Sequence, residues 1–359
     1  MTSFAGWQMP LRYGSEMAEH LAVRRAAGLF DLSHMGEIVV TGPDAGAALD
    51  YALTGQASAL SPGRARYTMI CAEDGGVLDD LVVYRRGEQE FLVIANASNT
   101  ATVFGALADR AEGYDAAVVD ATQDYALIAV QGPAAAGILA PLVQLDPAGP
   151  EDPGWPELGA MKYYAGAFGT VAGREAWVAR TGYTGEDGFE LYCRPQDAEH
   201  VWTVVTAEGA GAGLVPAGLA ARDTLRLEAG MPLYGNELGP DVTPFEAGLG
   251  RVVKFDKPGE FVGREALAAR ASSGPSRHLA GLTIASRRIA RHGYPVLADG
   301  QTCGAVTSGA PSPTLGVPIA MAYLDRPAAS MAGAVLSVGI RGEAVPAHLT
   351  DLPFYSRRR

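Results

Sequence analysis

Apolar and polar positions alternate along this chain in patterns that predict both helices and strands over roughly its first 270 residues. Apolar residues recur at helical spacing in four segments, namely Ser15 to Ala27, Ala97 to Gly113, Gln196 to Glu208 and Leu219 to Gly230. Strands are predicted at Glu37 to Thr41, Tyr67 to Ala72, Val77 to Tyr84, Phe91 to Asn96 and Ala126 to Val130. The turn at Glu73 to Gly76 indicates a hairpin between the second and third of these strands.

One local pattern occurs twice, which suggests two related halves. Gly42-Pro43 follows the strand that ends at Thr41, and Gly132-Pro133 follows the strand that begins at Ala126. A helix is expected after each, because proline suits the first turn of a helix, where its missing N–H is no loss. The repeat predicts two related α/β subdomains.

The residues from Ala271 onward have a different character. Ala271 to Ser276 is rich in Ser, Gly and Pro, and is predicted to be a linker. Beyond it, short strands are predicted near His278 to Ile284, Tyr294 to Ala298, Ala305 to Ser308, Ile319 to Leu324 and Val335 to Ile340. Short strands at this spacing are typical of a small β-barrel or sandwich. We therefore expect one region over residues 1–270 and a β-domain over residues 278–355.

Composition and charge narrow the classes of function. The chain is 48% hydrophobic and 19% charged, and its net charge of −12 disfavours a broad nucleic-acid surface. Cys71, Cys193 and Cys303 form no C-x-x-C pair, which disfavours a disulfide framework or a zinc site and suits a reducing cytoplasm. The six histidines show no metal-ligand spacing, so no metal is predicted. No apolar run approaches the roughly 20 residues that span a bilayer.

Two adjacent acids stand out in the strand Val77 to Tyr84. The strand is apolar on both faces, so Asp79 and Asp80 are expected to be buried. Burying an unpaired charge costs several kcal/mol, so each carboxylate should have a partner or a function. Because side chains alternate along a strand, only one of the two can face a given site. The alternative is that both cap local backbone amides.

A second candidate lies in the stretch from Arg180 to Tyr192. Two tight turns precede a short strand, on which Phe189 and Leu191 can pack inward while Glu190 and Tyr192 share the other face. A carboxylate suits a ligand with two parallel N–H donors, such as a guanidine or an aminopyrimidinone. The alternative is a surface hairpin with a solvated Glu190.

Basic residues and one histidine have less specific patterns. Arg222 and Arg226 lie four residues apart on one helix face, which is either solvated or directed at a pocket. His34 fits a core or capping histidine better than a functional one.

Six segments in this order resemble the T-protein family of the glycine cleavage system, which are aminomethyltransferases. They are Phe4-Ala5-Gly6-Trp7, Phe30 to Met35, Gly75 to Leu81, Arg180 to Glu190, Ala221 to Glu228, and Thr307 to Gly309 with Ser312 to Gly316. The resemblance covers nearly the whole chain. It implies an α+β, three-lobed fold, in which two intertwined α/β subdomains surround a central folate site and a C-terminal β-barrel closes one side.

The resemblance also implies a reaction in glycine catabolism and one-carbon metabolism. An aminomethyl group carried on the dihydrolipoyl arm of a lipoylated H-protein passes to tetrahydrofolate, which gives 5,10-methylenetetrahydrofolate and ammonia. Tetrahydrofolate is thus the acceptor substrate, and the lipoyl group belongs to the partner. By resemblance, Asp80 is the catalytic carboxylate. The expected folate-binding residues are Glu190 and Arg222 on the pterin side, Tyr67 and Tyr183 against the ring, and Asn96 in the lining.

Two rival functions share part of this pattern. A folate-dependent demethylase of the same superfamily would have a similar folate site, although Asp79-Asp80 and Ser33-His34-Met35 favour the glycine cleavage branch. A non-catalytic folate-binding protein of iron–sulfur assembly would carry a Lys-Gly-Cys-Tyr type motif, which this chain lacks.

Arg287, Arg288 and Arg291 form a basic cluster in an otherwise acidic chain. They are either a solvated turn or a docking patch for an acidic carrier protein, since opposite potentials speed encounter.

Overall fold

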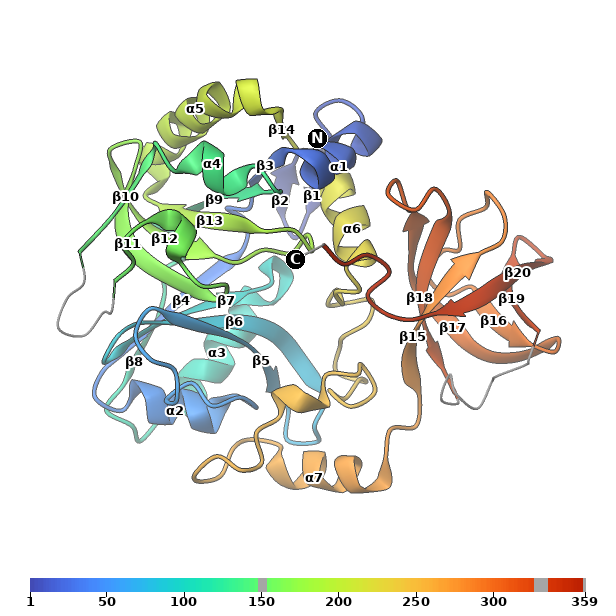
Figure 1. Ribbon diagram of the computed structural model, residues 1–359. Coiled ribbons are helices and arrows are strands. Elements are labelled where there is room, and N and C mark those ends of the chain that lie inside the picture. Colours follow the sequence, from blue (N-terminus) through green and yellow to red (C-terminus); the bar gives the residue numbers. More distant parts are fainter. Residues whose placement is uncertain (148–153, 326–334, 358–359) are drawn as a thin grey trace.

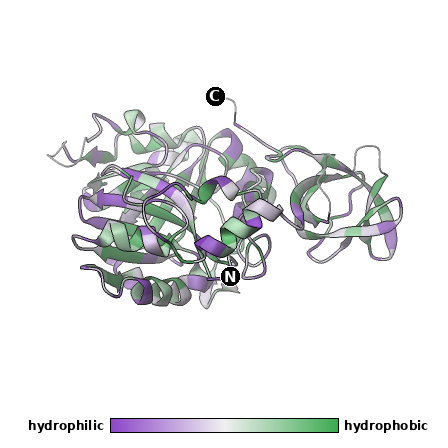
Figure 2. Ribbon diagram, turned by 90° about the horizontal axis from the view of Figure 1, so that it is seen from below, coloured by the Kyte–Doolittle hydropathy of each residue, from purple (hydrophilic) through white to green (hydrophobic). Residues whose placement is uncertain are grey.

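The computed structural model describes residues 1–147, 154–325 and 335–357. Figure 1 shows two bodies, a large α+β part on the left and a β-barrel on the right, with helix α6 (Leu219–Glu228) beside the barrel. Figure 2 shows the same two bodies from below. No helix in the described ranges has the length and apolar character needed to cross a membrane.

The first half of the α+β part is an antiparallel sheet with two helices on one face. Its strands are ordered β5 (Arg64–Cys71), β6 (Val77–Gly87), β7 (Glu90–Ala95), β4 (Gly36–Thr41) and β8 (Ala117–Asp120). Helices α2 (Ala45–Ala52) and α3 (Thr100–Arg110) bury Leu49 and Val103 against it. The hairpin and the third antiparallel strand predicted from the sequence are confirmed.

The second half repeats this arrangement with more strands. Its order is β14 (Leu214–Pro216), β3 (Ala27–Asp31), β9 (Ala126–Gln131), β13 (Gly188–Cys193), β12 (Arg174–Arg180) and β11 (Ala165–Val171), and β10 (Val143–Leu145) pairs with β11. Helices α1 (Glu16–Arg25), α4 (Ala135–Leu139) and α5 (Ala198–Gly209) accompany these strands, and α4 and α5 contribute to the core of this half.

The two halves share one twelve-stranded sheet. They meet where Ala165 of β11 pairs with Arg64 of β5. A single buried cluster takes Tyr84 and Ile94 from the first half and Tyr192 from the second, so the halves also pack against each other. This arrangement confirms the predicted α+β fold.

The repeated Gly–Pro unit has a steric cause in both halves. Gly42 and Gly132 have φ values of +125° and +136°, which side-chain-bearing residues rarely adopt. A Cβ atom on Gly42 would lie 2.4 Å from the carbonyl oxygen of Asp115, and one on Gly132 would lie 2.5 Å from that of Ala26. Both turns therefore need glycine, and helices α2 and α4 follow them as predicted.

Helix α7 and a hairpin at the N-terminus differ from expectation. Helix α7 (Arg264–Ser273) includes the first three residues of the segment Ala271 to Ser276, which was predicted to be a linker. The predicted linker therefore begins too early. The division at residues 270 and 278 stays a prediction. The first residues form a small hairpin of β1 (Thr2–Phe4) and β2 (Trp7–Met9), which the sequence patterns did not predict.

The C-terminal strands close into a barrel, which settles the choice between barrel and sandwich. Their order is β15 (His278–Ile284), β18 (Pro318–Leu324), β17 (Gln301–Pro311), β16 (Pro295–Ala298), β19 (Leu336–Ile340) and β20 (Glu343–Thr350). Strand β20 was not predicted. Pro346 lies in its middle, and a proline argues against a strand when only the sequence is considered.

A buried carboxylate fastens the barrel to the α+β part. Glu228, at the end of α6, accepts hydrogen bonds from Ser312 Oγ, the Thr314 N–H and hydroxyl, and Arg24 of α1. The chain after the barrel returns to the same place, where the N–H of Tyr355 donates to the carbonyl of Glu228 at 2.8 Å. The barrel is therefore held to the large body by its own strands and by the C-terminal tail.

Candidate functional site

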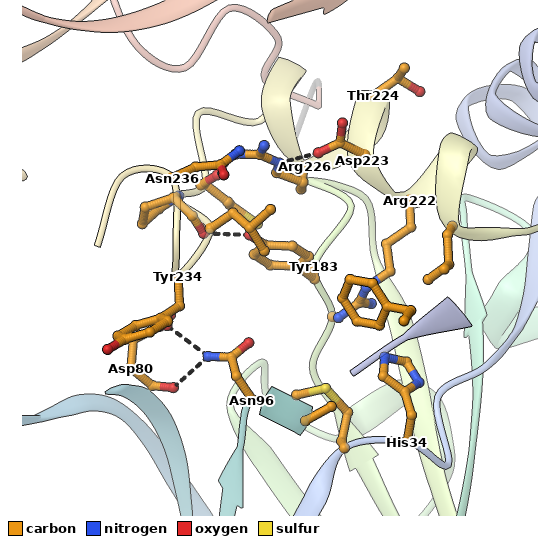
Figure 3. Close-up of a pocket in the computed structure, with 18 of the residues that line it drawn as sticks. His34, Asp80, Asn96, Tyr183, Arg222, Asp223, Thr224, Arg226, Tyr234 and Asn236 are labelled. Carbon is orange, nitrogen blue, oxygen red and sulfur yellow. Dashed lines mark hydrogen bonds and ion pairs between the residues drawn. The ribbon is translucent and has the colours of Figure 1, made fainter. Parts of the chain in front are cut away.

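A cavity of about 880 Å³ lies where the two halves of the sheet, helix α6 and the barrel converge. Its lining includes all six residues that the family resemblance assigned to catalysis or folate binding, Tyr67, Asp80, Asn96, Tyr183, Glu190 and Arg222. Figure 3 shows Asp80 and Asn96 on one side, Arg222 and His34 on the other, and Tyr183 between them. The chain therefore brings these residues, far apart in sequence, into one cavity.

Asp80 is half-buried on β6, between strands β5 and β7. Its Oδ2 accepts a hydrogen bond from the Tyr67 hydroxyl at 3.0 Å, and its Oδ1 accepts one from Nδ2 of Asn96 at 2.8 Å. Burial raises the pKa of Asp80, and these two bonds oppose the rise. The carboxylate is thus fixed in position and has a proton affinity above the ordinary one.

Asp79 is fully buried, and it is not part of the cavity lining. Its carboxylate accepts from the backbone N–H of Asn96 at 2.9 Å and from Nδ2 of Asn99 at 2.7 Å. Burial and the neighbouring Asp80 raise the pKa of Asp79. The expectation that only one acid faces the site is confirmed. Backbone capping holds for Asp79, whereas the side chains of Tyr67 and Asn96 hold Asp80.

Glu190 lies on β13, a strand with neighbours on both sides, so the alternative of a solvated hairpin is wrong. Its Oε2 accepts from the hydroxyl of Thr181 at 2.6 Å and from those of Tyr84 and Tyr192 at 3.3 Å each. No residue within the described ranges donates a hydrogen bond to Oε1. One oxygen is therefore already engaged, and the other remains open as an acceptor.

Of these three hydroxyl residues, only Tyr192 had a signal in the sequence, since it shares a strand face with Glu190. Thr181 belongs to the preceding turn, and Tyr84 comes from β6 in the other half of the sheet. Sequence reasoning missed both, because their proximity depends on how the two halves pack.

Arg222 and Tyr183 lie against each other in the wall of the cavity. The guanidinium carbon of Arg222 is 4.8 Å from the centroid of the Tyr183 ring. Among the residues that the structure describes, the guanidinium of Arg222 makes no ion pair and no hydrogen bond, so it does not pair with Glu190. Burial lowers the pKa of Arg222, which nonetheless stays charged. Its N–H donors are available to a ligand.

Arg226, one turn further along α6, is 1% exposed and has a structural role. It donates to Asp223 at 2.8 Å, to Glu237 at 2.9 Å and to the Ser308 hydroxyl of the barrel at 2.8 Å. The sequence left the helix face with Arg222 and Arg226 as either solvated or directed at a pocket, and the structure shows that these two residues have different environments. Arg222 is open to the cavity, and Arg226 joins three segments beside it.

His34 is buried and also lines the cavity, with the Phe4 ring edge-on at 5.5 Å. Burial and the charge of Arg222 lower the pKa of His34 to about 3. The imidazole is therefore neutral at ordinary pH. The prediction of a core histidine accounts for the burial of His34, whereas its place in the cavity lining was not predicted.

The basic cluster does not form one uniform patch. Arg288 pairs with Glu343 of β20 at 2.7 Å, whereas Arg287 and Arg291 are exposed. Arg291 also belongs to the cavity lining. Within the described ranges, no three His, Cys, Asp or Glu side chains are grouped as metal ligands would be.

Two family models match this chain. The GCVT N-terminal domain matches residues 1–257, and the glycine cleavage T-protein C-terminal barrel domain matches residues 277–356. The division between them falls before the barrel, as the structure shows it.

Relatives and a solved structure extend the match to the whole chain. A protein named aminomethyltransferase from Streptomyces avermitilis is 60% identical over 362 residues, covering 100% of this chain and 94% of that protein. One from Moorella thermoacetica is 48% identical over 99% of this chain and 94% of that protein. The crystal structure of glycine cleavage system aminomethyltransferase T from Bartonella henselae has a TM-score of 0.88 at 36% identity, covering 99% of this chain and 94% of that one. The chain belongs to the glycine cleavage T-protein family of aminomethyltransferases.

Proposed function

We propose that the central cavity is the tetrahydrofolate site of this aminomethyltransferase, and that Asp80 is its catalytic carboxylate. The observation that carries the proposal is the arrangement of open groups on the cavity walls. Glu190 presents an unengaged carboxylate oxygen and Arg222 presents unpaired N–H donors. Asp80 lies across the cavity from Arg222 and is held by two hydrogen bonds.

The open groups match the edge of a reduced pterin. Its ring and 2-amino N–H groups are donors that Glu190 Oε1 can accept, and the Thr181 hydroxyl holds the other oxygen of that carboxylate in place. The guanidinium of Arg222 can donate to the pterin carbonyl. Tyr183 lies against Arg222 and Tyr67 donates a hydrogen bond to Asp80, so we propose that both rings pack against the folate.

Asp80 is suited to electrostatic stabilisation and proton relay. In the reaction, the C–S bond to the lipoyl sulfur and the C–N bond to the leaving ammonia break, while two bonds form from the methylene carbon to N5 and N10 of folate. The carbon passes through an iminium-like cation, which a fixed carboxylate stabilises. N5 and N10 each lose a proton, and the thiol and the ammonia each gain one. Asp80 can carry these protons because its pKa is raised toward neutrality.

The lipoyl arm of an H-protein is the proposed donor, and it must enter the cavity from the surface. Arg291 is both exposed and part of the cavity lining, and Arg287 is exposed nearby in the sequence. We propose that these two arginines attract the acidic carrier. Arg288 is less suited to this role because it already pairs with Glu343.

Single-turnover kinetics with aminomethyl-loaded H-protein test the proposal. We expect methylenetetrahydrofolate to form only when tetrahydrofolate is present, and ammonia to be released faster by several orders of magnitude with tetrahydrofolate than without it. Asp80→Asn should keep folate binding within about threefold and lose at least ~100-fold in turnover, because the amide can neither carry the negative charge nor relay a proton. Equal turnover by the two proteins would contradict the role of Asp80. Tight folate binding without any turnover of the wild-type protein would favour a methyl donor and a demethylase.

A further inference from the structure

Asp79 lies directly behind the proposed catalytic carboxylate, and within the described ranges every hydrogen bond to its carboxylate comes from one short segment. The backbone N–H of Asn96 donates to its Oδ2 at 2.9 Å. Nδ2 of Asn96 and Nδ2 of Asn99 donate to its Oδ1 at 2.9 and 2.7 Å. Asp79 therefore anchors the turn that follows β7, without reaching the cavity itself.

The side-chain amide of Asn96 is shared between the two acids. Its nitrogen has two hydrogens, and three acceptors lie within reach. These are Oδ1 of Asp79 at 2.9 Å, Oδ1 of Asp80 at 2.8 Å and the backbone oxygen of Asp80 at 3.2 Å. The two shorter contacts account for both hydrogens. The amide is thus fully used as a bridge, and a ligand can meet only its carbonyl oxygen.

From this geometry, we propose that Asp79 is a positioning residue, which acts through the Asn96 amide to hold Asp80 in place and to share its proton equilibrium. The inference rests on the proposed role of Asp80. Asp79 keeps Asn96 in one orientation, and Asn96 in turn holds one oxygen of Asp80 while Tyr67 holds the other. A carboxylate fixed from both sides loses little freedom when the reaction begins.

The two acids also have an electrostatic link. They are neighbours in sequence and lie in a buried strand. A single amide, that of Asn96, bridges their carboxylates, so the two negative charges lie close together and repel each other. Two such groups release their protons in two steps that belong to the pair. The charge of Asp79 therefore affects the protonation of Asp80 even though Asp79 never touches the substrate.

Asp79→Asn separates this role from a purely structural one. The substitution preserves size and removes the charge and one acceptor. We expect tetrahydrofolate affinity within about threefold of wild type and a fall in kcat of at least about tenfold, since binding uses other residues while proton transfer depends on Asp80. A kcat within about twofold of wild type would overturn the proposal.

A second readout is independent of turnover. In protein labelled with ¹³C at aspartate carboxyls, with the Asp80 signal identified by Asp80→Asn, Asp80 should titrate in two steps in the wild type and in one step in Asp79→Asn. An identical titration curve in both proteins overturns the coupling. Because no folate or H-protein is needed, this result stands even if the wild-type protein fails to transfer the aminomethyl group, which would contradict the proposed function instead.

Three further variants guard against a folding defect. Asn96→Ala cuts the bridge but leaves Asp79 its bond from the Asn96 backbone, so it should lower kcat as Asp79→Asn does. The double variant should be no worse than either single one, because both remove the same link.

Asp50→Asn is the matched control, since Asp50 is a buried carboxylate of the same half that accepts from Ala57 and Ser58 outside the cavity lining. Its melting temperature should fall while the Asp80 titration stays unchanged; a changed titration in this control overturns the assignment to Asp79.

Discussion

Oε1 of Glu228, the last residue of helix α6, accepts a hydrogen bond from Oγ of Ser312 in the barrel at 2.5 Å. Burial by itself would raise the pKa of Glu228, but bonds and charge from His20, with further bonds from Ser312 and Thr314, lower it to about 2. The ionised form is therefore stabilised in the folded protein, and its contribution is present above the unfolded value of 4.5 and lost as the pH falls toward 2.

Glu228→Gln should consequently destabilise the protein at neutral pH by roughly 3 kcal/mol, and by progressively less as the pH falls below about 4.5. Urea unfolding of both proteins between about pH 7 and pH 3 measures this difference. Ser312→Ala is the control that removes one donor and keeps the charge, so it should cost about 1 kcal/mol at neutral pH and show a smaller dependence on pH than Glu228→Gln. A pH-independent loss in Glu228→Gln would show that the charge is unimportant.

Glu37 gives the opposite pH dependence. It is fully buried on β4, and no described residue donates a hydrogen bond to either carboxylate oxygen. Burial first, and then the charges of Asp120 and Glu190, raise its pKa to about 9. Because this value exceeds the unfolded one of 4.5, Glu37 lowers stability progressively as the pH rises from 4.5 to 9. Glu37→Gln should therefore be the more stable protein by roughly 3 kcal/mol at about pH 7, and the advantage should vanish near pH 4. Thermal melts of both proteins across this pH range test the sign of the effect. A difference in stability that stays constant with pH would refute the prediction.

Tyr67→Phe removes the hydroxyl that holds Oδ2 of Asp80. That bond lowers the pKa of Asp80, so its loss should raise the pKa and move the acidic limb of the kcat profile to higher pH. We expect kcat at the optimum to fall about tenfold, because Asp80 is then held from one side only. Tyr51→Phe, on the exposed part of α2, is the control and should leave the profile in place.

Glu190→Gln tests the binding half of the site. The amide keeps the size of the side chain but replaces one acceptor by a donor, which faces the pterin N–H groups. The dissociation constant for tetrahydrofolate should rise by about 10- to 100-fold, the range expected for a hydrogen bond to a charged group. Titration calorimetry measures it. At saturating folate, kcat should change far less, and an unchanged affinity would remove Glu190 from the pterin site.

Replacing Arg287 and Arg291 with alanine tests carrier docking. The KM for H-protein should rise severalfold at low salt, and the difference from wild type should shrink as the ionic strength approaches about 1 M, where charges are screened. Arg270→Ala, an exposed arginine on α7 outside the cavity lining, is the matched control. Equal salt dependence in the double variant and the control would mean that these arginines belong to a solvated turn.

Much of the fold follows from local patterns in the sequence. The alternation in Val77 to Tyr84 places Asp80 on one face and Asp79 on the other, and the turn chemistry at Gly42 and Gly132 fixes where α2 and α4 begin. These features depend on neighbours within a few residues, which a sequence displays directly. Strand β20 was missed because Pro346 interrupts its otherwise alternating pattern. In the barrel, both edges of this strand are paired, one with β19 and the other with β15.

The site was harder to predict where it depends on packing between distant segments. Arg222 and Arg226 occupy the same helix face in the sequence, but the barrel and the loop after α6 cover only Arg226. Likewise, the hydroxyl of Tyr84 reaches Glu190 from 106 positions away. The resemblance to the family supplied the positions lining the cavity, and the structure supplied which of their atoms remain open.

The attachment of the barrel at Glu228 and Tyr355 limits how a substrate can reach the cavity. The chain enters the barrel after α7 and comes back to α6 at its end, where Arg24 stacks over Tyr355 at 4.0 Å from the ring centroid. Two separate segments, the loop with Ser312 and the tail with Tyr355, thus bind α6 at Glu228 and oppose movement of the barrel away from that helix. Under the proposed function, the folate and the lipoyl arm both enter past a barrel that is fastened to α6, which favours a long, thin donor arm.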